Sequence, residues 1–211
     1  MEDNRGNADN EGVRKAALIA LFLVVPLLSA NAYRILYAEE YYQLYHEHLH
    51  HYPDDTMEDI FYLETALKMD FANPLYALAP IKDKTQWERY RYLFSMHVNL
   101  KLVAAYLALG VKYEKQDAFF YNYPWKQQNL DSLNIAEKVY QAAYAYWTKA
   151  QEWSTKAWAM RDIRLEKIDE WEDENFRIET GDLDYKDTID RQLAHLAKVR
   201  ADFQAMGPGT Y

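Results

Sequence analysis

The chain has 211 residues, of which 50% are hydrophobic and 27% are charged, and its formal net charge is −9. An acidic chain lacks the basic surface that neutralises phosphates, so we expect no nucleic-acid partner. The absence of cysteine excludes disulfides, thiolate catalysis and cysteine-based zinc sites. With only 6 Gly and 6 Pro and many good helix formers, the composition predicts an all-α protein.

The N-terminal region has the pattern of a membrane anchor. Residues 1–15 are polar and charged and predict a disordered tail. Residues 16–33 contain no charged side chain, and with the residues up to 36 they reach the roughly 20 residues that span a bilayer. Arg14 and Lys15 stand directly before this stretch, and such positive charge stays on the cytoplasmic side. We expect a single-pass helix at 16–36 in the cell inner membrane, with the tail cytoplasmic and the body periplasmic.

Two other interpretations of this stretch remain open. Ala30-Asn31-Ala32 is an A-x-A pattern that a signal peptidase would cleave, although the preceding segment is long and acidic for a signal peptide. A buried helix of a cytosolic protein would normally keep a polar face, which this stretch lacks. In all three cases residues 37–206 are expected to form a helical domain, followed by a short tail at 207–211.

A row of tyrosines opens the body of the chain. Tyr33, Tyr37, Tyr41 and Tyr45 recur every four residues, and we expect one helix to continue from the anchor to His51. The row has two interpretations: packing against the rest of the domain, or a docking surface for another membrane protein.

Two capping boxes predict the next helices. Thr56–Asp59 opens a helix that ends near Asp70, and Thr85–Glu88 opens a long helix that ends near Gly110.

The second half of the body predicts further long helices. A helical pattern begins at Asp131 or Ser132 and runs to about Thr180, where Gly181 stops it. Such a length is unusual for a globular domain, so we expect either a break or bend near Ser154-Thr155 or a helix that projects from the body. Its small alanines alternate with large aromatic residues, a pattern that lets helices pack closely. Asp187 is expected to cap the last helix.

Residues 59–74, DIFYLETALKMDFANP, resemble the second helix and exit turn of a tetratricopeptide repeat. Ala66 falls at the small position of that repeat, and Asp70 and Asn73-Pro74 fit its closing turn. Phe71 and Asp59 depart from the pattern, and weaker echoes occur at 103–110 and 136–157.

This resemblance implies a superhelical scaffold that binds other proteins, including other copies of itself, and carries no chemistry. Membrane-anchored periplasmic proteins of this kind are similar to assembly subunits of envelope machines, such as collar subunits of the spirochaete flagellar motor. The resemblance therefore implies membrane or periplasmic protein partners.

One motif points to a different chemistry. His46-Glu47-His48-Leu49-His50 contains H-E-x-x-H, in which two histidines one helical turn apart bind zinc and the glutamate acts as general base. No typical third ligand follows, and four of the six histidines are clustered here, so a chance match is the competing interpretation. We therefore expect a solvated helix end with no metal and no cofactor. The alternatives are a zinc hydrolase using His46, Glu47 and His50, a non-catalytic metal site, and a patch of histidines that titrates near neutral pH.

Residues 116–130 carry a group of aromatic side chains around Pro124: Phe119, Phe120, Tyr121, Tyr123 and Trp125. Such a group either fills a gap between helices or binds a partner. The expected protein-binding residues are Tyr37, Tyr41, Tyr45, Phe119, Phe120, Tyr123 and Trp125. A small-ligand binding protein that uses this loop is a further alternative. The acidic run 166–179 predicts an exposed helix face with pairs of charges one turn apart.

Overall fold

The computed structural model describes residues 35–114 and 122–209, and the chain divides into two units, 1–35 and 36–211. The predicted tail, the predicted anchor up to residue 34, and Phe119, Phe120 and Tyr121 lie outside the described residues. The elements are α2 (Ala38–His51), α3 (Thr56–Lys68), the 3-10 helix η1 (Pro74–Tyr76), α4 (Lys84–Glu114), the 3-10 helix η2 (Tyr123–Trp125), α5 (Lys126–Trp158), α6 (Asp169–Thr180) and α7 (Tyr185–Ala205). No β-strand occurs within 35–114 or 122–209, which confirms the all-α prediction.

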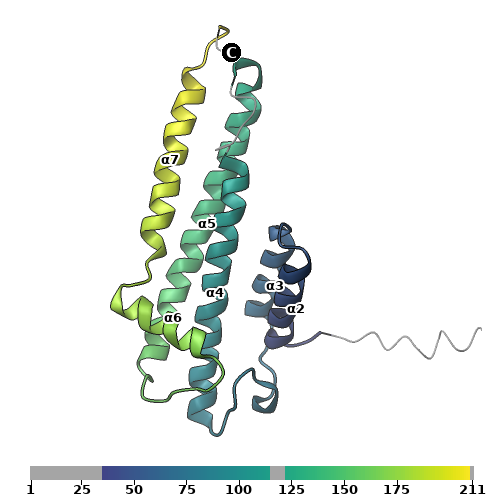
Figure 1. Ribbon diagram of the computed structural model, residues 1–211, viewed down its shortest axis with the longest axis vertical. Coiled ribbons are helices and arrows are strands. Elements are labelled where there is room, and N and C mark those ends of the chain that lie inside the picture. The colour runs from purple at the N-terminus through teal and green to yellow at the C-terminus, as the bar shows by residue number, and fades with distance from the viewer. Residues whose placement is uncertain (1–34, 115–121, 210–211) are drawn as a thin grey trace, which may run out of the picture. The chain divides into compact units, whose positions relative to one another are not determined.

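Three long helices form the body of the second unit. Helices α4, α5 and α7 lie side by side, with α5 in contact with both of the others (Figure 1). The short helix α6 lies across one end of α4 and α5, and the hairpin α2–α3 packs against α4. Helix α4 is therefore covered on several sides by different elements.

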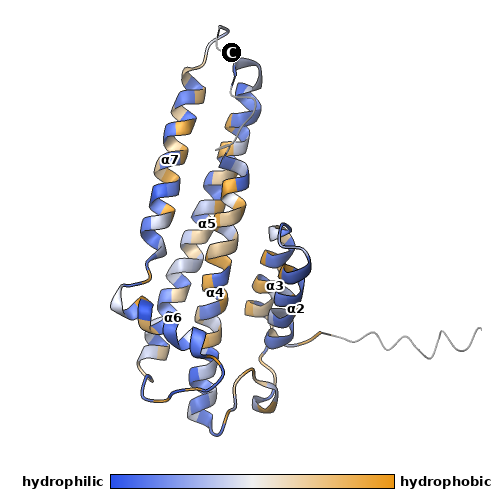
Figure 2. Cartoon of the chain, viewed as in Figure 1, coloured by the Kyte–Doolittle hydropathy of each residue, from blue (hydrophilic) through white to orange (hydrophobic). Residues whose placement is uncertain are grey.

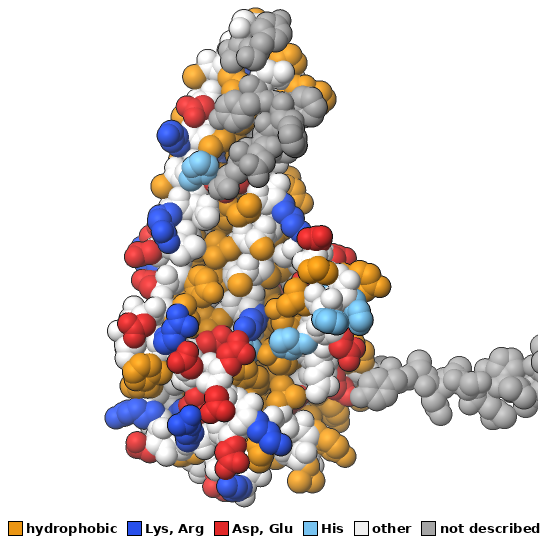
Figure 3. All heavy atoms as spheres, in the orientation of Figure 1, with side chains coloured by type: hydrophobic (Ala, Val, Ile, Leu, Met, Phe, Trp, Pro, Cys, Tyr) orange, Lys and Arg blue, Asp and Glu red, His pale blue; other side chains and the backbone are white. Residues whose placement is uncertain are grey.

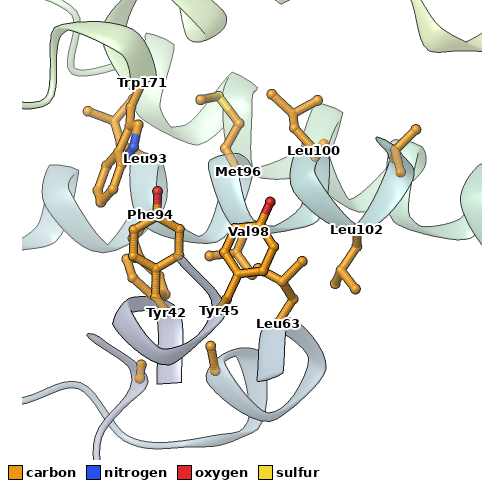
Figure 4. Close-up of a cluster of buried hydrophobic side chains, with 14 of the residues drawn as sticks. Tyr42, Tyr45, Leu63, Leu93, Phe94, Met96, Val98, Leu100, Leu102 and Trp171 are labelled. Carbon is orange, nitrogen blue, oxygen red and sulfur yellow. The ribbon is translucent and has the colours of Figure 1, made fainter. Parts of the chain in front are cut away.

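This central position explains the composition of α4. Leu93, Phe94, Met96, Val98 and Leu102 are almost fully buried although they point in different directions. Figure 4 shows tyrosines of α2 and Leu63 of α3 meeting one side of α4, with Trp171 of α6 nearby. From Leu93 to Val103 the helix is buried on nearly all sides, and such a stretch has no need of a polar face. Figure 2 shows more hydrophobic residues along α4 than along α2 or α6.

Helix α4 is the one helix of the described residues that is long and apolar enough to cross a membrane. However, 61% of its most apolar window is buried among the other helices, which is typical of a core helix.

Helix α5 packs through small residues. Ala136, Ala143, Ala150 and Ala157 recur every seven residues and are fully buried, with Tyr140 and Trp147 buried between them. Burial of these alanines confirms the small residues of the predicted alternation, whereas its large residues Val139, Tyr146 and Trp153 are only partly buried. A seven-residue period keeps one stripe facing a neighbouring helix, and alanine permits a close approach.

Several predicted helix starts were wrong by a few residues, because an aspartate further upstream forms the cap. Asp55 accepts the N–H of Glu58, Asp83 accepts those of Thr85 and Gln86, and Asp184 accepts that of Lys186. An aspartate caps at least as well as threonine. The helices thus begin at Thr56, Lys84 and Tyr185, and Asp187 lies inside α7.

Helix α5 also differs from its prediction at both ends. It begins at Lys126, because Pro124 in η2 leads directly into it, and Asp131 lies inside its first turns. The expected break occurs after Trp158 and not near Ser154, which is fully buried within the helix. Gly181 has a φ of 82° and ends α6, as its position predicted.

Helix α2 begins at Ala38, so the prediction of one helix running on through residues 35–37 was wrong. Tyr37 is extended, and the Glu40 side chain accepts the backbone N–H groups of Leu36 at 2.7 Å and Tyr37 at 3.0 Å. The N–H of Ala38 then donates to the carbonyl of Asp70 at 2.9 Å. These bonds satisfy the backbone N–H groups at the start of α2, and they hold the preceding residues out of the helical conformation.

The helix lengths limit where the tetratricopeptide resemblance can apply. Helices α2 and α3 have 14 and 13 residues, but α4 and α5 have 31 and 33. Each long helix nearly matches a whole repeat, which has roughly 34 residues in two helices. The resemblance therefore stays a prediction for the hairpin α2–α3 alone.

Candidate functional site

The tyrosine row of α2 does not form one surface. Tyr45 is buried in the core, Tyr41 is half-buried against it, and Tyr37 is exposed at the helix start. Tyr42, which lies outside the predicted row, is buried and meets Phe94 and Trp171 edge-on. The α2 face that packs on the domain thus follows Ala38, Tyr42 and Tyr45. Among the described residues of the predicted row, which exclude Tyr33, only Tyr37 is exposed.

The residues of the H-E-x-x-H motif lie on the outer side of α2. Glu47 and His50 are exposed, and the His46 ring lies against those of Tyr42 and Tyr45. Partial burial, with His97 and Lys101 acting in the same direction, lowers the pKa of His46. Within residues 35–114 and 122–209, the motif joins no group of three potential metal ligands. His48 serves another purpose, since its Nδ1 lies 2.8 Å from Asp59 Oδ1 and connects α2 to α3.

The described part of the aromatic loop is partly open. Tyr123 and Trp125 of η2 are both exposed, beside the start of α5. Their role as protein-binding residues stays a prediction, and the other expected aromatic residues of this loop lie outside the described part of the chain.

A buried polar network connects α2, α4 and α6. The ring of His97 in α4 has no solvent exposure; its Nε2 lies 2.7 Å from the Tyr42 hydroxyl and its Nδ1 lies 2.5 Å from Glu174 Oε2. A neutral ring protonated at Nδ1 satisfies both contacts, because it donates to the carboxylate and accepts from the tyrosine. Trp171 stacks on the same ring at a centroid distance of 5.0 Å. His97 thus holds three helices together.

Lys101 completes this network one helical turn further along α4. Its ammonium group lies 2.8 Å from Glu170 and 3.8 Å from Glu174. Burial alone would lower the pKa of Lys101, but the two carboxylates outweigh it and raise the pKa. The hydrogen bond from Lys101 in turn lowers the pKa of Glu170. Lys101 and Glu170 are therefore charged at neutral pH and pair with each other.

His97, Glu170 and Glu174 also form the one group of potential metal ligands found in the described ranges, with ligand atoms within 4.8 Å of one another. One imidazole and two carboxylates suit zinc. The ammonium of Lys101 already supplies the positive charge there, and both His97 nitrogens are engaged. The arrangement fits an ion-pair network that docks α6, and it is closed to a substrate at His97.

Arg89 makes a second connection between α4 and α6. It is 2% exposed, pairs with Glu172 and donates from Nη1 to the carbonyl of Ala157 at 2.5 Å. Glu172 also accepts the N–H of Leu165 at 3.1 Å. The acidic helix α6 is therefore not simply the exposed face that the sequence predicted, because two of its glutamates are largely buried against α4.

The sequence does contain a signal for these contacts. Arg89, His97 and Lys101 share one face of α4 at spacings of eight and four residues. The acidic run of α6 offers Glu170 and Glu174 at the same four-residue spacing as His97 and Lys101. Charged and titratable residues on the buried face of a helix need partners of opposite charge, because an unpaired charge is costly to bury.

A carboxylate also links α3 to the long helices. Glu64 Oε1 accepts hydrogen bonds of 2.7 Å from the hydroxyls of Tyr106 in α4 and Tyr146 in α5, whose rings stack. Burial raises the pKa of Glu64, but these bonds and the nearby Lys68 outweigh it and hold the pKa below its ordinary value. The carboxylate form thus fixes the hairpin on the body.

The hairpin α2–α3 carries exposed hydrophobic side chains near its closed end. Tyr52, Met57 and Phe61, which we call the hairpin patch, are 63%, 59% and 54% exposed. The centroid of the His48 ring lies 5.3 Å from that of Tyr52 and 5.6 Å from that of Tyr62. The Tyr62 ring in turn contacts the Phe61 ring. Tyr52 and Phe61 are thus linked through the rings of His48 and Tyr62. Clustered exposed aromatic residues mark interaction sites.

Comparison with known proteins covers the part of the chain from α4 onward. A family model described as a domain of unknown function (DUF8513) matches residues 85–206, which is more than half of the chain. No curated protein matches, and no solved structure matches. The match includes Arg89, His97, Lys101 and all of α6, and it omits the hairpin α2–α3. The chain belongs to the family of this domain of unknown function.

Proposed function

We propose that the chain is a membrane-anchored, extracytoplasmic helical scaffold that mediates protein–protein interaction in an envelope assembly, such as a flagellar motor collar. The uncharged stretch 16–33 acts as the single inner-membrane anchor, which is shorter than the 16–36 expected from the sequence because residues 35–37 are not helical. Residues 1–15 act as the cytoplasmic tail and residues 37–206 as the periplasmic domain. Support for the anchor comes from the uncharged stretch and the basic pair before it. The tetratricopeptide-like hairpin α2–α3 supplies the partner surface.

The hairpin patch is the observation that carries this proposal. Three large hydrophobic side chains at least half exposed are costly to leave in water, and a partner that covers them gains their burial. The buried polar networks behind the patch hold the hairpin firmly on α4 and α5, so the surface is organised before a partner arrives.

No specific observation favours the alternatives. The H-E-x-x-H residues lie on an outer helix face and lack a third ligand within the described residues. An open hollow along α7 is lined by Asp187, Asp190, Arg191 and Ala194 and has none of the aromatic walls that a small-ligand site would use.

Topology is tested with a reporter fused after Tyr211 that becomes active only outside the cytoplasm. The proposal expects an active reporter in cells carrying the full chain. The same fusion with Arg14 and Lys15 both changed to Glu weakens the topology signal and is expected to lower reporter activity. A reporter that stays inactive because the fused C-terminus is in the cytosol would contradict the proposed topology and the envelope role.

The partner surface is tested by photo-crosslinking in intact cells. A photoreactive residue replaces Phe61 in the hairpin patch, and a matched control replaces the exposed Phe176 of α6. We expect a protein adduct from position 61 and none from position 176. The absence of any adduct at 61, with Met57 and Tyr52 giving the same result, would contradict a scaffold that uses this surface.

A further inference from the structure

An uncharged loop follows α3. Residues 71–81, FANPLYALAPI, are the longest run without a charged residue outside 16–33. The next longest runs, 102–111 and 139–148, lie inside α4 and α5. The loop, in contrast, exposes its hydrophobic residues: Leu75 and Tyr76 of η1 are 85% and 75% exposed. Leu75 is the most exposed large hydrophobic side chain of the described residues.

Backbone contacts place this loop beside the start of α2. Tyr37 and Asp70 form a parallel bridge, and the N–H of Ala38 donates to the carbonyl of Asp70 at 2.9 Å. The buried Glu39 carboxylate accepts the N–H of Ala72 at 2.9 Å. Two further exposed hydrophobic residues, Leu36 and Tyr37, therefore lie next to the loop. We call Leu36, Tyr37, Leu75 and Tyr76 the entry surface.

The entry surface lies close along the chain to the proposed membrane anchor, and this bears on what covers it. Only Arg34 and Ile35 stand between Leu36 and the uncharged stretch 16–33. At about 3.5 Å per residue, the chain carries Leu36 no more than about 10 Å beyond the end of that stretch. A bilayer that holds the stretch therefore comes within reach of Leu36, and the bridge to Asp70 brings η1 to the same end.

We infer that the entry surface rests in the interfacial layer of the lipid bilayer, so that the η1 loop is a second membrane contact beside the anchor. This inference rests on the proposed anchor. Tyrosine prefers the level of the lipid head groups, and leucine gains from burial among the upper acyl chains. A second contact restrains the tilt of the domain, which a single anchor leaves free.

The charges around the loop suit a lipid surface. Residues 71–81 carry no charged side chain, whereas the whole chain carries −9. Figure 3 shows hydrophobic side chains at the lower right edge of this face and charged side chains at the lower left. The loop is thus a place where the acidic domain can approach a bilayer without repulsion from anionic lipids.

This contact also orients the hairpin patch. The closed end of the hairpin lies one length of α2 away from the entry surface, and 14 residues of helix span about 20 Å. A bilayer at the entry surface leaves Tyr52, Met57 and Phe61 facing the aqueous compartment, where a protein partner reaches them.

The experiment uses the full chain in vesicles of phosphatidylcholine. Because the chain contains no cysteine, single variants Leu75→Cys, Val24→Cys and Phe176→Cys each take one environment-sensitive fluorescent label. Position 24 reports on the anchor, position 75 on the η1 loop and position 176 on an exposed site of α6. Emission is compared between plain vesicles, vesicles whose lipids are brominated near the head groups and vesicles whose lipids are brominated deep in the acyl chains. Bromine quenches only labels within contact distance, so the first brominated set reports on position 75 and the second on position 24, near the middle of the span.

We expect quenching at 24 and 75 and none at 176. Quenching at 24 without quenching at 75 would overturn the membrane contact and leave the anchor standing. Quenching at 75 without quenching at 24 would support the membrane contact of the η1 loop and contradict the anchor. Quenching at neither position would contradict both. A blue-shifted but unquenched label at 75 would mean that a second copy covers the loop, and quenching at all three positions would mean that lipid adsorbs unselectively; either result overturns the inference.

Discussion

Glu64 shows at the scale of one residue how a carboxylate joins three helices. It accepts two tyrosine hydroxyls on a single oxygen atom, and hydrogen bonds to a charged group are stronger than neutral ones. We expect Glu64→Gln to lower the free energy of unfolding by about 1–2 kcal/mol at neutral pH, because the amide keeps only the neutral bonds. Urea unfolding of the variant, with Glu152→Gln at an exposed ion pair as control, measures this loss.

The same residue predicts a pH dependence. The pKa of Glu64 is lowered in the folded chain, so its stabilisation is present above the ordinary glutamate pKa and is lost as the pH falls through the folded value. The difference between the wild type and Glu64→Gln should therefore shrink on acidification. A difference that stays constant down to pH values below the folded pKa would contradict this account.

The charged side chain of Arg89 is almost completely buried. Arg89→Met strands the Glu172 carboxylate and the Ala157 carbonyl, and we expect it to cost about 3–5 kcal/mol, as does removal of one partner of a buried pair. Adding Glu172→Gln should recover part of this loss, because no unpaired charge then remains. A double variant less stable than Arg89→Met would show that the pair is not coupled in this way; chemical unfolding of the two variants decides.

At the scale of the element, the contact between α4 and α5 depends on a glycine. A Cβ at Gly110 would overlap the ring of Tyr140, and that ring is held by the bond of its hydroxyl to Glu114 at 2.6 Å. Alanine favours a helix over glycine by about 1 kcal/mol, but overpacking costs about 1–3 kcal/mol.

We therefore expect Gly110→Ala to lower the melting temperature, against the usual direction for this substitution within a helix. Gly207→Ala, where a Cβ meets nothing within 4 Å, is the matched control and should leave it unchanged. If Gly110→Ala proved neutral or stabilising, Tyr140 would have to move aside despite its bond to Glu114.

At the scale of the whole molecule, the scaffold and hydrolase hypotheses differ in metal content. The purified full chain is expected to carry no stoichiometric zinc after passage through a metal-free column, measured by elemental analysis. Glu47→Gln is expected to leave the unfolding curve unchanged, because that side chain is exposed. One zinc per chain that disappears in His46→Ala and His50→Ala would instead favour the hydrolase.

Local pattern alone predicted a good part of this molecule. Composition and spacing predicted an all-helical chain, the stop at Gly181 and the packed alanines of α5, because each depends on backbone preference or on side chains of one helix. The helix starts were less accurate, since Thr56, Thr85 and Asp187 match a cap motif while Asp55, Asp83 and Asp184 provide the actual caps.

The sequence by itself determined the helical class, the approximate elements and the uncharged N-terminal stretch on which the membrane proposal depends. Only the tertiary structure decided that Tyr45 is used in the core, that His97, Lys101 and Arg89 meet the glutamates of α6, and that η1 lies beside Leu36. The physical reason is that a local motif records one element's own preferences. A buried ion pair depends on which two helices meet, and that is set by the packing of the whole chain.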